Sequence, residues 1–525
     1  MATDETCGVF SRLDGALDPE RVHRFVVGED SQPSAMSPEQ AEQELGDPFA
    51  TLVLLQGKFP QTAAECLAAI DEATAEGDPL KDQMSFLVGE GSQIAVEENT
   101  TTLGRGLRFI ITRGATANGP PDGPDILLSV FHPDQKDIEL MAWDRRAGGF
   151  NYYRTVGDDP AWVFAGNARH ALSDPTQGKG PFESHTSGAF LMKELKLPWI
   201  NWHSPNANIF ATAFADDDDR CEHPWFTDKE PGGALTCELA VAKPGMERWA
   251  RARFQALTEN GGAIRDPGRI MEQLLSTPTV NLFSSRTESR AAAGSSDAFD
   301  LPGTFFVDAD GFAAVGLDGP PPFAVAGNIY ASSLRTFEAK LTDGEGFVRD
   351  GDTHFAFVVP ERAFEDQVVL VEAMRSGLVS RRLAACLLMT DFPNPVFSAR
   401  RARLLAHVPG SAAVSDGQTS FSQEMADAIL AAAEGSPEES PEREFAERWN
   451  VGEDFDSTFN GLLADYYAAV TERLGDQAGF DAYFQLAETR REQVRKMPIF
   501  ENPLLFARTN VPTAPRSMQG DGSVI

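Results

Sequence analysis

The sequence predicts an α+β fold, built from two diverged repeats of an antiparallel meander followed by helices, with a helical bundle near the C-terminal end. Short apolar segments separated by Gly, Pro and Asp turns recur between residues 107 and 165, as in neighbouring antiparallel strands. After residue 420, apolar residues recur at helical spacing. A chain of 525 residues exceeds one ordinary core, so we expect about two to four domains.

An internal duplication is suggested by two stretches that share a pattern. Residues 143–167 and 307–328 each contain an Asp, a glycine turn, a Gly-Phe pair and a terminal Ala-Gly-Asn, in that order. The Phe precedes the Asn by 17 positions in the first stretch and by 16 in the second. The competing interpretation is that Asp-x-x-Gly turns joined to apolar strands recur by chance in meander proteins. His185 and His354 occupy corresponding places downstream.

The domain organisation expected from these patterns has five parts. They are an irregular N-terminal arm over 1–48, a first α+β repeat over 49–230, a second α+β repeat over 231–410, a helical C-terminal region over 411–508 and an extended tail over 509–525. Because ligand pockets favour the junctions of domains, a site is expected where the two repeats meet.

The first repeat is expected to begin with a short strand at 52–55 and a helix at 63–75, which Thr62 can cap. The strands of its meander are expected at 107–112, 126–131, 138–143, 150–155 and 162–165. A helix near 188–195 and a loop at 198–203 should follow.

The second repeat is expected to alternate helices and short strands. Its helices are expected at 246–258, 267–275, 361–375 and 380–389, and its strands at 279–283, 304–307, 312–316, 323–326 and 355–359. In the C-terminal region, apolar stripes predict helices that include residues 421–429, 459–474 and 480–496.

The charge balance excludes several classes of partner. The chain has 45 basic and 79 acidic side chains, a formal net charge of −34, which repels nucleic acid phosphates and anionic lipid headgroups.

No apolar run approaches the roughly 18 residues needed to span a bilayer, and residues 1–14 lack the apolar core of a secretory signal. Five scattered cysteines without C-x-x-C spacing favour a reducing cytoplasm. We therefore expect a cytoplasmic protein with no nucleic acid and no membrane partner.

Candidate site residues concentrate in one part of the chain. Five of the eight histidines and five of the seven tryptophans lie between His132 and Trp225. Imidazole is the commonest metal ligand and suits iron or copper, so one hypothesis is a metal site. Its ligands would be His170, His185 and His203.

Two other interpretations of these histidines remain open. In a metal-free site, His185 or His203 would act as general base, and Asn201 or Asn167 would donate a hydrogen bond to developing charge. The surrounding substrate-binding residues would be Trp162, Asn167, Trp199 and Trp202. Alternatively, the histidines are partly buried, hydrogen-bonded structural residues. The sequence has no H-x-H or H-E-x-x-H pair that would fix two ligands on one element.

A cluster of six arginines between residues 375 and 403 stands out against the acidic background. Arginine binds carboxylate or phosphate in a bidentate manner, so Arg400 and Arg401 are candidates for holding an anionic substrate. The competing interpretation is that they pair with acidic groups or cap helices. The acidic run at 216–219 and the Asp-x-Asp-Gly at 308–311 are expected to be turns.

The function that these patterns favour is an enzyme acting on a small organic molecule, as a His-ligated iron or copper oxidoreductase or as a metal-free acid–base enzyme. The alternative is a non-catalytic ligand-binding or interaction protein with a Trp-rich interface, since Trp and Arg are typical interface anchors. Motifs of serine hydrolases, P-loop enzymes and Rossmann dehydrogenases are absent from the sequence. A homo-oligomer is left open.

Overall fold

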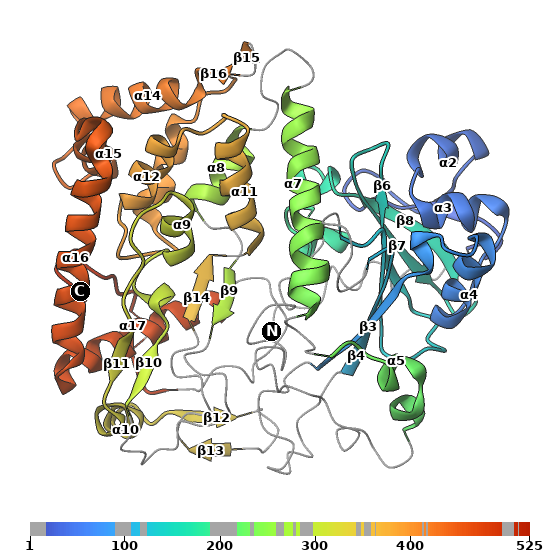
Figure 1. Cartoon of the computed structure of the whole chain (residues 1–525), viewed down its shortest axis with the longest axis horizontal. Helices are drawn as coiled ribbons and strands as arrows, with labels where there is room; N and C mark the ends of the chain where they lie inside the picture. Colours follow the sequence, from blue (N-terminus) through green and yellow to red (C-terminus); the bar gives the residue numbers. More distant parts are fainter. Residues whose placement is uncertain are drawn as a thin grey trace. The chain divides into compact units, whose positions relative to one another are not determined.

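The computed structural model divides into two compact units, which we describe separately (Figure 1). Unit 1 contains the described residues up to 253, and unit 2 those from 254 onward. The predicted boundaries at 48, 230 and 410 do not coincide with this division. The described residues are 17–89, 107–115, 123–188, 218–231, 236–258, 267–276, 280–283, 298–342, 348–350, 359–362, 364–411, 414–415, 418–495, 509–512 and 514–525.

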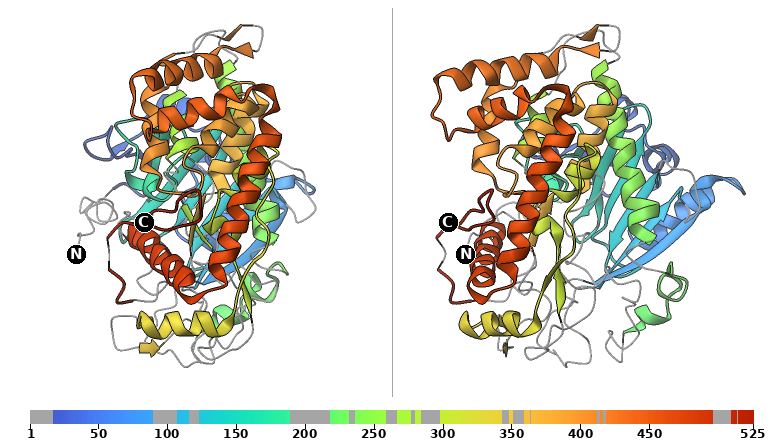
Figure 2. Two further views of the ribbon diagram at one scale, coloured as in Figure 1. Left: turned by 90° about the vertical axis from the view of Figure 1, so that its left-hand side faces the viewer. Right: turned by 60° about the vertical axis from the view of Figure 1, so that its left-hand side comes forward.

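Unit 1 is organised around an eight-stranded sheet with the order β2-β1-β8-β7-β6-β5-β4-β3 (Figures 1 and 2). Its strands are β1 (Val22–Arg24), β2 (Ser34–Ala35), β3 (Gln83–Gly89), β4 (Leu107–Arg113), β5 (Ile126–Val130), β6 (Glu139–Asp144), β7 (Gly149–Val156) and β8 (Ala161–Asn167). Strands β3 to β8 pair with their chain neighbours in antiparallel order, so the predicted meander is confirmed. β1 pairs with β8 in parallel.

Three short helices pack against one face of this sheet. They are α2 (Pro38–Glu44), α3 (Pro48–Leu52) and α4 (Ala63–Ala73). Thr62 caps α4 as predicted, accepting a hydrogen bond from the Glu65 amide. The predicted strand at 52–55 is wrong, because Asp47 and Pro48 begin a helix there. Residues 17–48, expected to be irregular, contain β1, β2 and α2.

The opposite face of the sheet is covered by residues 243–253 of α7 (Lys243–Thr258) and by the segment 170–188. The Trp249 indole of α7 lies close to Gly149 at the start of β7, and its Nε1 donates to the Ser187 carbonyl at 3.0 Å. Tyr152 of β7 packs edge to face on Phe182, with 5.3 Å between ring centroids. The sheet therefore lies between two layers. A short helix, α5 (Pro224–Thr227), contacts the edge strand β3.

Unit 2 is mainly helical, and its strands form separate two-stranded antiparallel sheets, β10-β11, β12-β13, β14-β9 and β15-β16. Its helices are α8 (Pro267–Leu275), α9 (Ala309–Ala314), α10 (Gly327–Thr336), α11 (Phe364–Arg375), α12 (Arg381–Met389), α13 (Ala399–Ala402), α14 (Phe421–Gly435), α15 (Pro441–Asn450), α16 (Phe455–Leu474) and α17 (Gln477–Arg495). Its strands are β9 (Val280–Phe283), β10 (Phe299–Leu301), β11 (Phe323–Val325), β12 (Lys340–Thr342), β13 (Val348–Asp350), β14 (Val359–Arg362), β15 (Val414–Ser415) and β16 (Gln418–Thr419).

The α+β class is confirmed, but the internal duplication is not. In the first stretch the shared Asp begins a hairpin, and in the second the corresponding residue, Asp308, caps α9 by accepting a hydrogen bond from the Gly311 amide at 3.0 Å. The strands predicted at 304–307 and 312–316 are therefore wrong, and 308–311 is no simple turn. After the shared Gly-Phe pair, Ala313 and Ala314 favour helix where the first stretch has Asn151 and Tyr152. The predicted strand at 323–326 is confirmed as β11.

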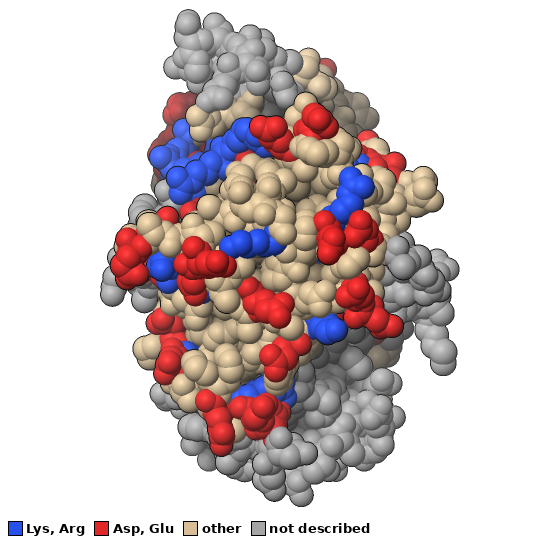
Figure 3. All heavy atoms as spheres, turned by 90° about the vertical axis from the view of Figure 1, so that its right-hand side faces the viewer, with Lys and Arg blue, Asp and Glu red and all other residues tan. Residues whose placement is uncertain are grey.

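Among the described helices, none is both long and apolar enough to cross a membrane. Four cysteines in the described ranges are free thiols, namely Cys66, Cys221, Cys237 and Cys386. Figure 3 shows one face on which carboxylates are widely spread, whereas the basic side chains gather mainly in one patch.

Candidate functional site at the ends of two parallel strands

The candidate site lies where the parallel strands β1 and β8 end at the same edge of the sheet. Val22 pairs with Trp162 and Arg24 with Phe164, so the residues that follow both strands are brought together. Here the turn after β1 meets the segment after β8. A Cβ on Gly28 would lie only 1.9 Å from the Pro175 carbonyl oxygen, so this meeting requires glycine.

A bulge in β8 shapes this edge. Tyr152 pairs with Gly166 but Tyr153 pairs with Phe164, which leaves Ala165 as an extra residue. Gly166 has φ +118°, a conformation that side chains oppose, and a Cβ there would approach the Phe182 ring to 3.0 Å. Bulges of this kind redirect side chains and are common next to active sites. This one precedes Asn167 and His170.

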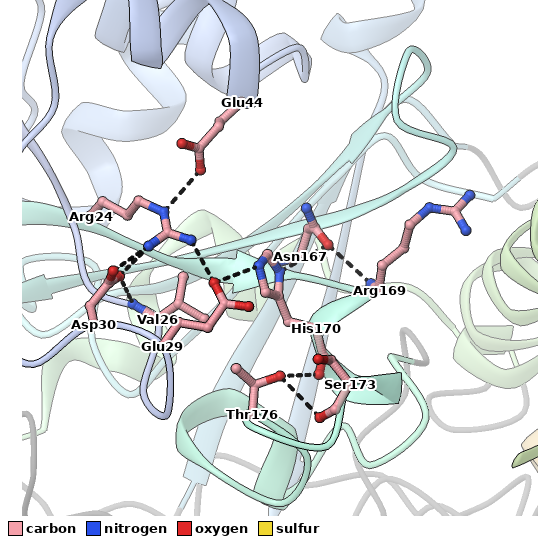
Figure 4. A network of polar contacts seen from close by, with 10 residues as sticks. All are labelled: Arg24, Val26, Glu29, Asp30, Glu44, Asn167, Arg169, His170, Ser173 and Thr176. Carbon is pink, nitrogen blue, oxygen red and sulfur yellow. Dashed lines mark hydrogen bonds and ion pairs between the residues drawn. The ribbon is translucent and has the colours of Figure 1, made fainter. Parts of the chain in front are cut away.

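The guanidinium of Arg24 organises three carboxylates at this edge (Figure 4). Its Nη2 lies 2.8 Å from Glu29, its Nε lies 3.0 Å from Glu44, and its Nη1 contacts both oxygens of Asp30. Asp30 also accepts a hydrogen bond from the Val26 amide at 2.7 Å, which closes the turn after β1. The Arg24 side chain is 15% exposed, and the Glu29 side chain is 34% exposed. Glu29 is thus held in place but is accessible to solvent.

His170 joins this network through Glu29 and through Asn167 (Figure 4). Its Nε2 lies 3.6 Å from Glu29 Oε2, longer than a hydrogen bond. Its Nδ1 lies 3.0 Å from both the backbone nitrogen and the side-chain oxygen of Asn167. With Nδ1 unprotonated, the ring accepts a hydrogen bond from the backbone N–H of Asn167. With Nδ1 protonated, it donates to Asn167 Oδ1, so Asn167 can satisfy either state.

Burial lowers the pKa of His170, and the neighbouring Glu29 carboxylate opposes that shift. The imidazole is therefore neutral near pH 7, while its side chain remains 16% exposed. A neutral, partly exposed imidazole beside a fixed carboxylate can take up a proton on Nε2, and the carboxylate then stabilises the imidazolium. The ring also stacks on Phe182, with 6.4 Å between centroids.

Trp162 does not belong to this site, although we predicted it as a substrate-binding residue. Its indole is completely buried, packs against Phe49 of α3 at 4.9 Å between centroids, and donates from Nε1 to the Pro60 carbonyl at 2.9 Å. Five tryptophans fall in the described ranges, and all five are buried, so they form core rather than interface there. They are Trp143, Trp162, Trp225, Trp249 and Trp449.

His185 lies on the opposite face of the sheet from Trp162. Its ring, which is 7% exposed, packs on Tyr152, whereas Tyr153 points toward Phe49 and Trp162. Successive strand residues face opposite sides of a sheet, so one pocket cannot be lined by both Trp162 and His185. His185 and His170 do belong to one aromatic cluster. His185 packs on Tyr152, Tyr152 packs on Phe182, and Phe182 stacks on His170.

No group of three or more His, Cys, Asp or Glu side chains that could hold a metal ion occurs in the described part of the chain. Among the predicted ligands, His170 and His185 are described and belong to no such group. Four predicted residues lie outside the described ranges, so their placement is not addressed. They are Trp199, Asn201, Trp202 and His203.

The predicted anion-binding arginines have protein partners. Arg401 is completely buried, and its guanidinium donates to the backbone carbonyls of Leu275, Asn394 and Pro395. Arg400 donates to Glu444 at 2.8 Å. Both arginines therefore bind groups of the protein itself, a carboxylate and backbone carbonyls, as the structural interpretation of the arginine cluster expects.

Four residues of this site were not predicted from the sequence, and all lie in the stretch expected to be an irregular arm: Arg24, Glu29, Asp30 and Glu44. The apolar residues Val22, Phe25 and Val26 beside Arg24 were a signal of a buried strand, and all three are buried. Pairing with β8, more than 130 residues later, depends on tertiary structure.

Comparison with known proteins adds no relative: no family model, no curated protein and no solved structure matches this chain.

Proposed function

We propose that this protein is an enzyme that acts on a small organic molecule by metal-free acid–base chemistry at the ends of β1 and β8, with His170 as the acid–base group. The observation that carries the proposal is the position of His170 between Asn167 and Glu29. Asn167 provides a partner for Nδ1 in either protonation state, and Glu29 lies 3.6 Å from Nε2. A proton can therefore enter and leave Nε2 while the ring stays in place.

The roles of the surrounding residues follow from their contacts. With Nδ1–H donating to Asn167, the Nε2 lone pair accepts a proton from a substrate O–H or N–H group. Glu29, which Arg24 holds at 2.8 Å, stabilises the imidazolium that forms. The proton then returns to the product. Free thiols at the described cysteines support a reducing cytoplasm as the setting.

The test is a turnover screen with matched variants. Full-length protein is incubated with a mixture of small hydroxy, amino and carbonyl compounds, and mass spectrometry follows their conversion. His170→Gln should lower turnover by at least about a hundredfold, and Glu29→Gln by a smaller factor. His132→Gln is the control, because this 39% exposed histidine pairs with Asp219 outside the network. Circular dichroism checks that each variant is folded.

Three outcomes would contradict the proposal. One is turnover that survives His170→Gln unchanged. Another is a compound that binds the protein and His170→Gln equally without conversion, which would instead support the ligand-binding alternative. The third is activity that appears only after loading with iron or copper and that disappears in His203→Ala, which would support the metal-dependent oxidoreductase.

A further inference from the structure

Unit 2 holds the segment 514–525 in a manner usually seen for a bound peptide. The amide of Asn394 donates from Nδ2 to the Met518 carbonyl and accepts from the Met518 amide, both at 3.0 Å. One side chain thus satisfies both backbone groups of one residue, as a neighbouring strand would. This pairing is independent of the side chain at 518, and it meets the free edge of a small hairpin in which Met518 is bridged to Val524.

The Met518 side chain gives the contact its selectivity. It is 1% exposed and belongs to the hydrophobic core of unit 2. Burying a methionine side chain contributes on the order of 1.5–3 kcal/mol relative to exposing it. A residue with a long apolar side chain is therefore required at this position.

A second anchor lies four residues further on, at Gly522. Tyr483 of α17 donates from its hydroxyl to the Gly522 carbonyl at 2.8 Å. Gly522 has φ +74°, and a Cβ there would lie 3.3 Å from the Val470 nitrogen. Arg473 of α16 contacts the carbonyl of the preceding residue, Asp521, at 3.3 Å. Glycine is thus selected both by conformation and by close packing.

The loop that carries Asn394 is held by contacts that do not involve residues 514–525. Asp391 and Phe397, at its two ends, have positive φ values of 52° and 55°, which is strained backbone for residues other than glycine. The Asp391 carboxylate accepts from Asn394 Nδ2 at 2.9 Å and from the Ser398 hydroxyl. These bonds set the orientation of the amide.

Two buried arginines donate hydrogen bonds to backbone carbonyls of the same loop. Arg401 donates to the carbonyls of Asn394 and Pro395, at 3.1 and 2.7 Å, and Arg490 donates to the Pro393 carbonyl at 3.3 Å. Strained backbone persists only where surrounding groups determine it, and here it presents a single side chain to another segment. Preorganisation of this kind lowers the entropy cost of binding.

We propose that Asn394, Tyr483 and Arg473 form a recognition site for a short β-hairpin peptide with methionine followed four positions later by glycine, and that residues 514–525, whose ends pair between Ser517 and Ile525, are its occupant in this chain. The site is independent of the network around His170. The segment contacts unit 2 through discrete anchors, so the same sequence supplied as a separate peptide should bind.

The test uses the full-length protein, with a specific protease site inserted after the exposed Pro512. After cleavage of the folded protein, a fluorescent peptide of residues 514–525 is added and binding is followed by anisotropy. We expect saturable exchange with the cleaved segment. Met518→Ala in the peptide should weaken binding by about thirtyfold or more. Asn394→Ala in the protein should weaken it by about tenfold.

The matched control is Ile525→Ala in the peptide, because that side chain is 69% exposed and should change the dissociation constant less than about twofold. The proposal is overturned if the cleaved segment never exchanges with the labelled peptide over days, because it is then a fixed part of the core. It is equally overturned if the segment leaves, circular dichroism is unchanged and the labelled peptide does not bind.

Discussion

The phenol of Tyr153, in the middle of β7, donates a hydrogen bond to the buried carboxylate of Asp47, which begins helix α3. The same carboxylate accepts from the Ala50 amide at 2.9 Å and from Asn151 Nδ2 at 2.8 Å. One aspartate therefore caps a helix and fastens that helix to the sheet. Burial raises its pKa, and the three hydrogen bonds oppose that shift.

Asp47→Ala should lower the free energy of unfolding of unit 1 by more than about 2 kcal/mol, because it removes a helix cap and leaves three donors without an acceptor. Urea unfolding followed by tryptophan fluorescence measures this, since four of the five described tryptophans lie in unit 1. The control is Asp159→Ala, an exposed position that should change stability by less than about 0.5 kcal/mol. An equal effect of both variants would contradict this role for Asp47.

Gly166→Ala should destabilise unit 1 by more than about 1 kcal/mol, because φ +118° is unfavourable for alanine and the Phe182 ring is 3.0 Å from the new Cβ. Gly268→Ala provides the contrast. Gly268 lies in helix α8 with open space around it, so alanine there should stabilise by up to about 1 kcal/mol. Thermal unfolding of the two variants tests the difference in sign.

Asp308→Asn should lower the stability of unit 2 by about 3–5 kcal/mol, because it leaves the Arg362 guanidinium buried without its carboxylate. The two side chains are 3% and 1% exposed and lie 2.7 Å apart. Asp310→Asn is the control, since Asp310 is exposed and its carboxylate accepts a hydrogen bond from Gln367 Nε2 at 2.7 Å. Calorimetry should show a large shift for the first variant and little for the second.

The stability of unit 1 should fall as the pH falls below about 6.5, through the window between the ordinary pKa of histidine and the lowered pKa of His170. In this window the unfolded chain binds a proton that the folded chain does not, so protonation favours unfolding. Above the window both states are neutral at this residue, and the contribution is constant. His170→Gln should remove that part of the pH dependence.

Urea midpoints measured from about pH 7.5 to about pH 5 on the protein and on His170→Gln test this prediction. The two curves should be parallel above pH 6.5 and should converge or cross below it. His132→Gln serves again as the control, because His132 is 39% exposed. If the curves stay parallel over the whole range, burial does not shift the titration of His170 as described.

Local patterns in the sequence were sufficient for the meander of unit 1. Strands β4 to β8 and the Thr62 cap of α4 are confirmed, because alternating apolar residues between glycine turns and a hydroxyl before a helix act over a few residues. The pattern shared by residues 143–167 and 307–328 did not predict their secondary structure equally well. The pattern of an Asp followed by a glycine turn begins a hairpin at Asp144 and a helix at Asp308, because the residues that follow decide between the two.

The candidate site shows the same limit. The sequence placed importance on His170 and Asn167, but grouped them with Trp162 and His185, which lie on opposite faces of the sheet. Glu29, the carboxylate that meets His170, follows β1, a strand of three residues whose burial depends on its parallel pairing with β8. The sequence by itself determined strands β4 to β8, the Thr62 cap and the excess of acidic charge. Only the tertiary structure decided which side chains meet, because pairing between distant strands follows from the packing of the whole sheet.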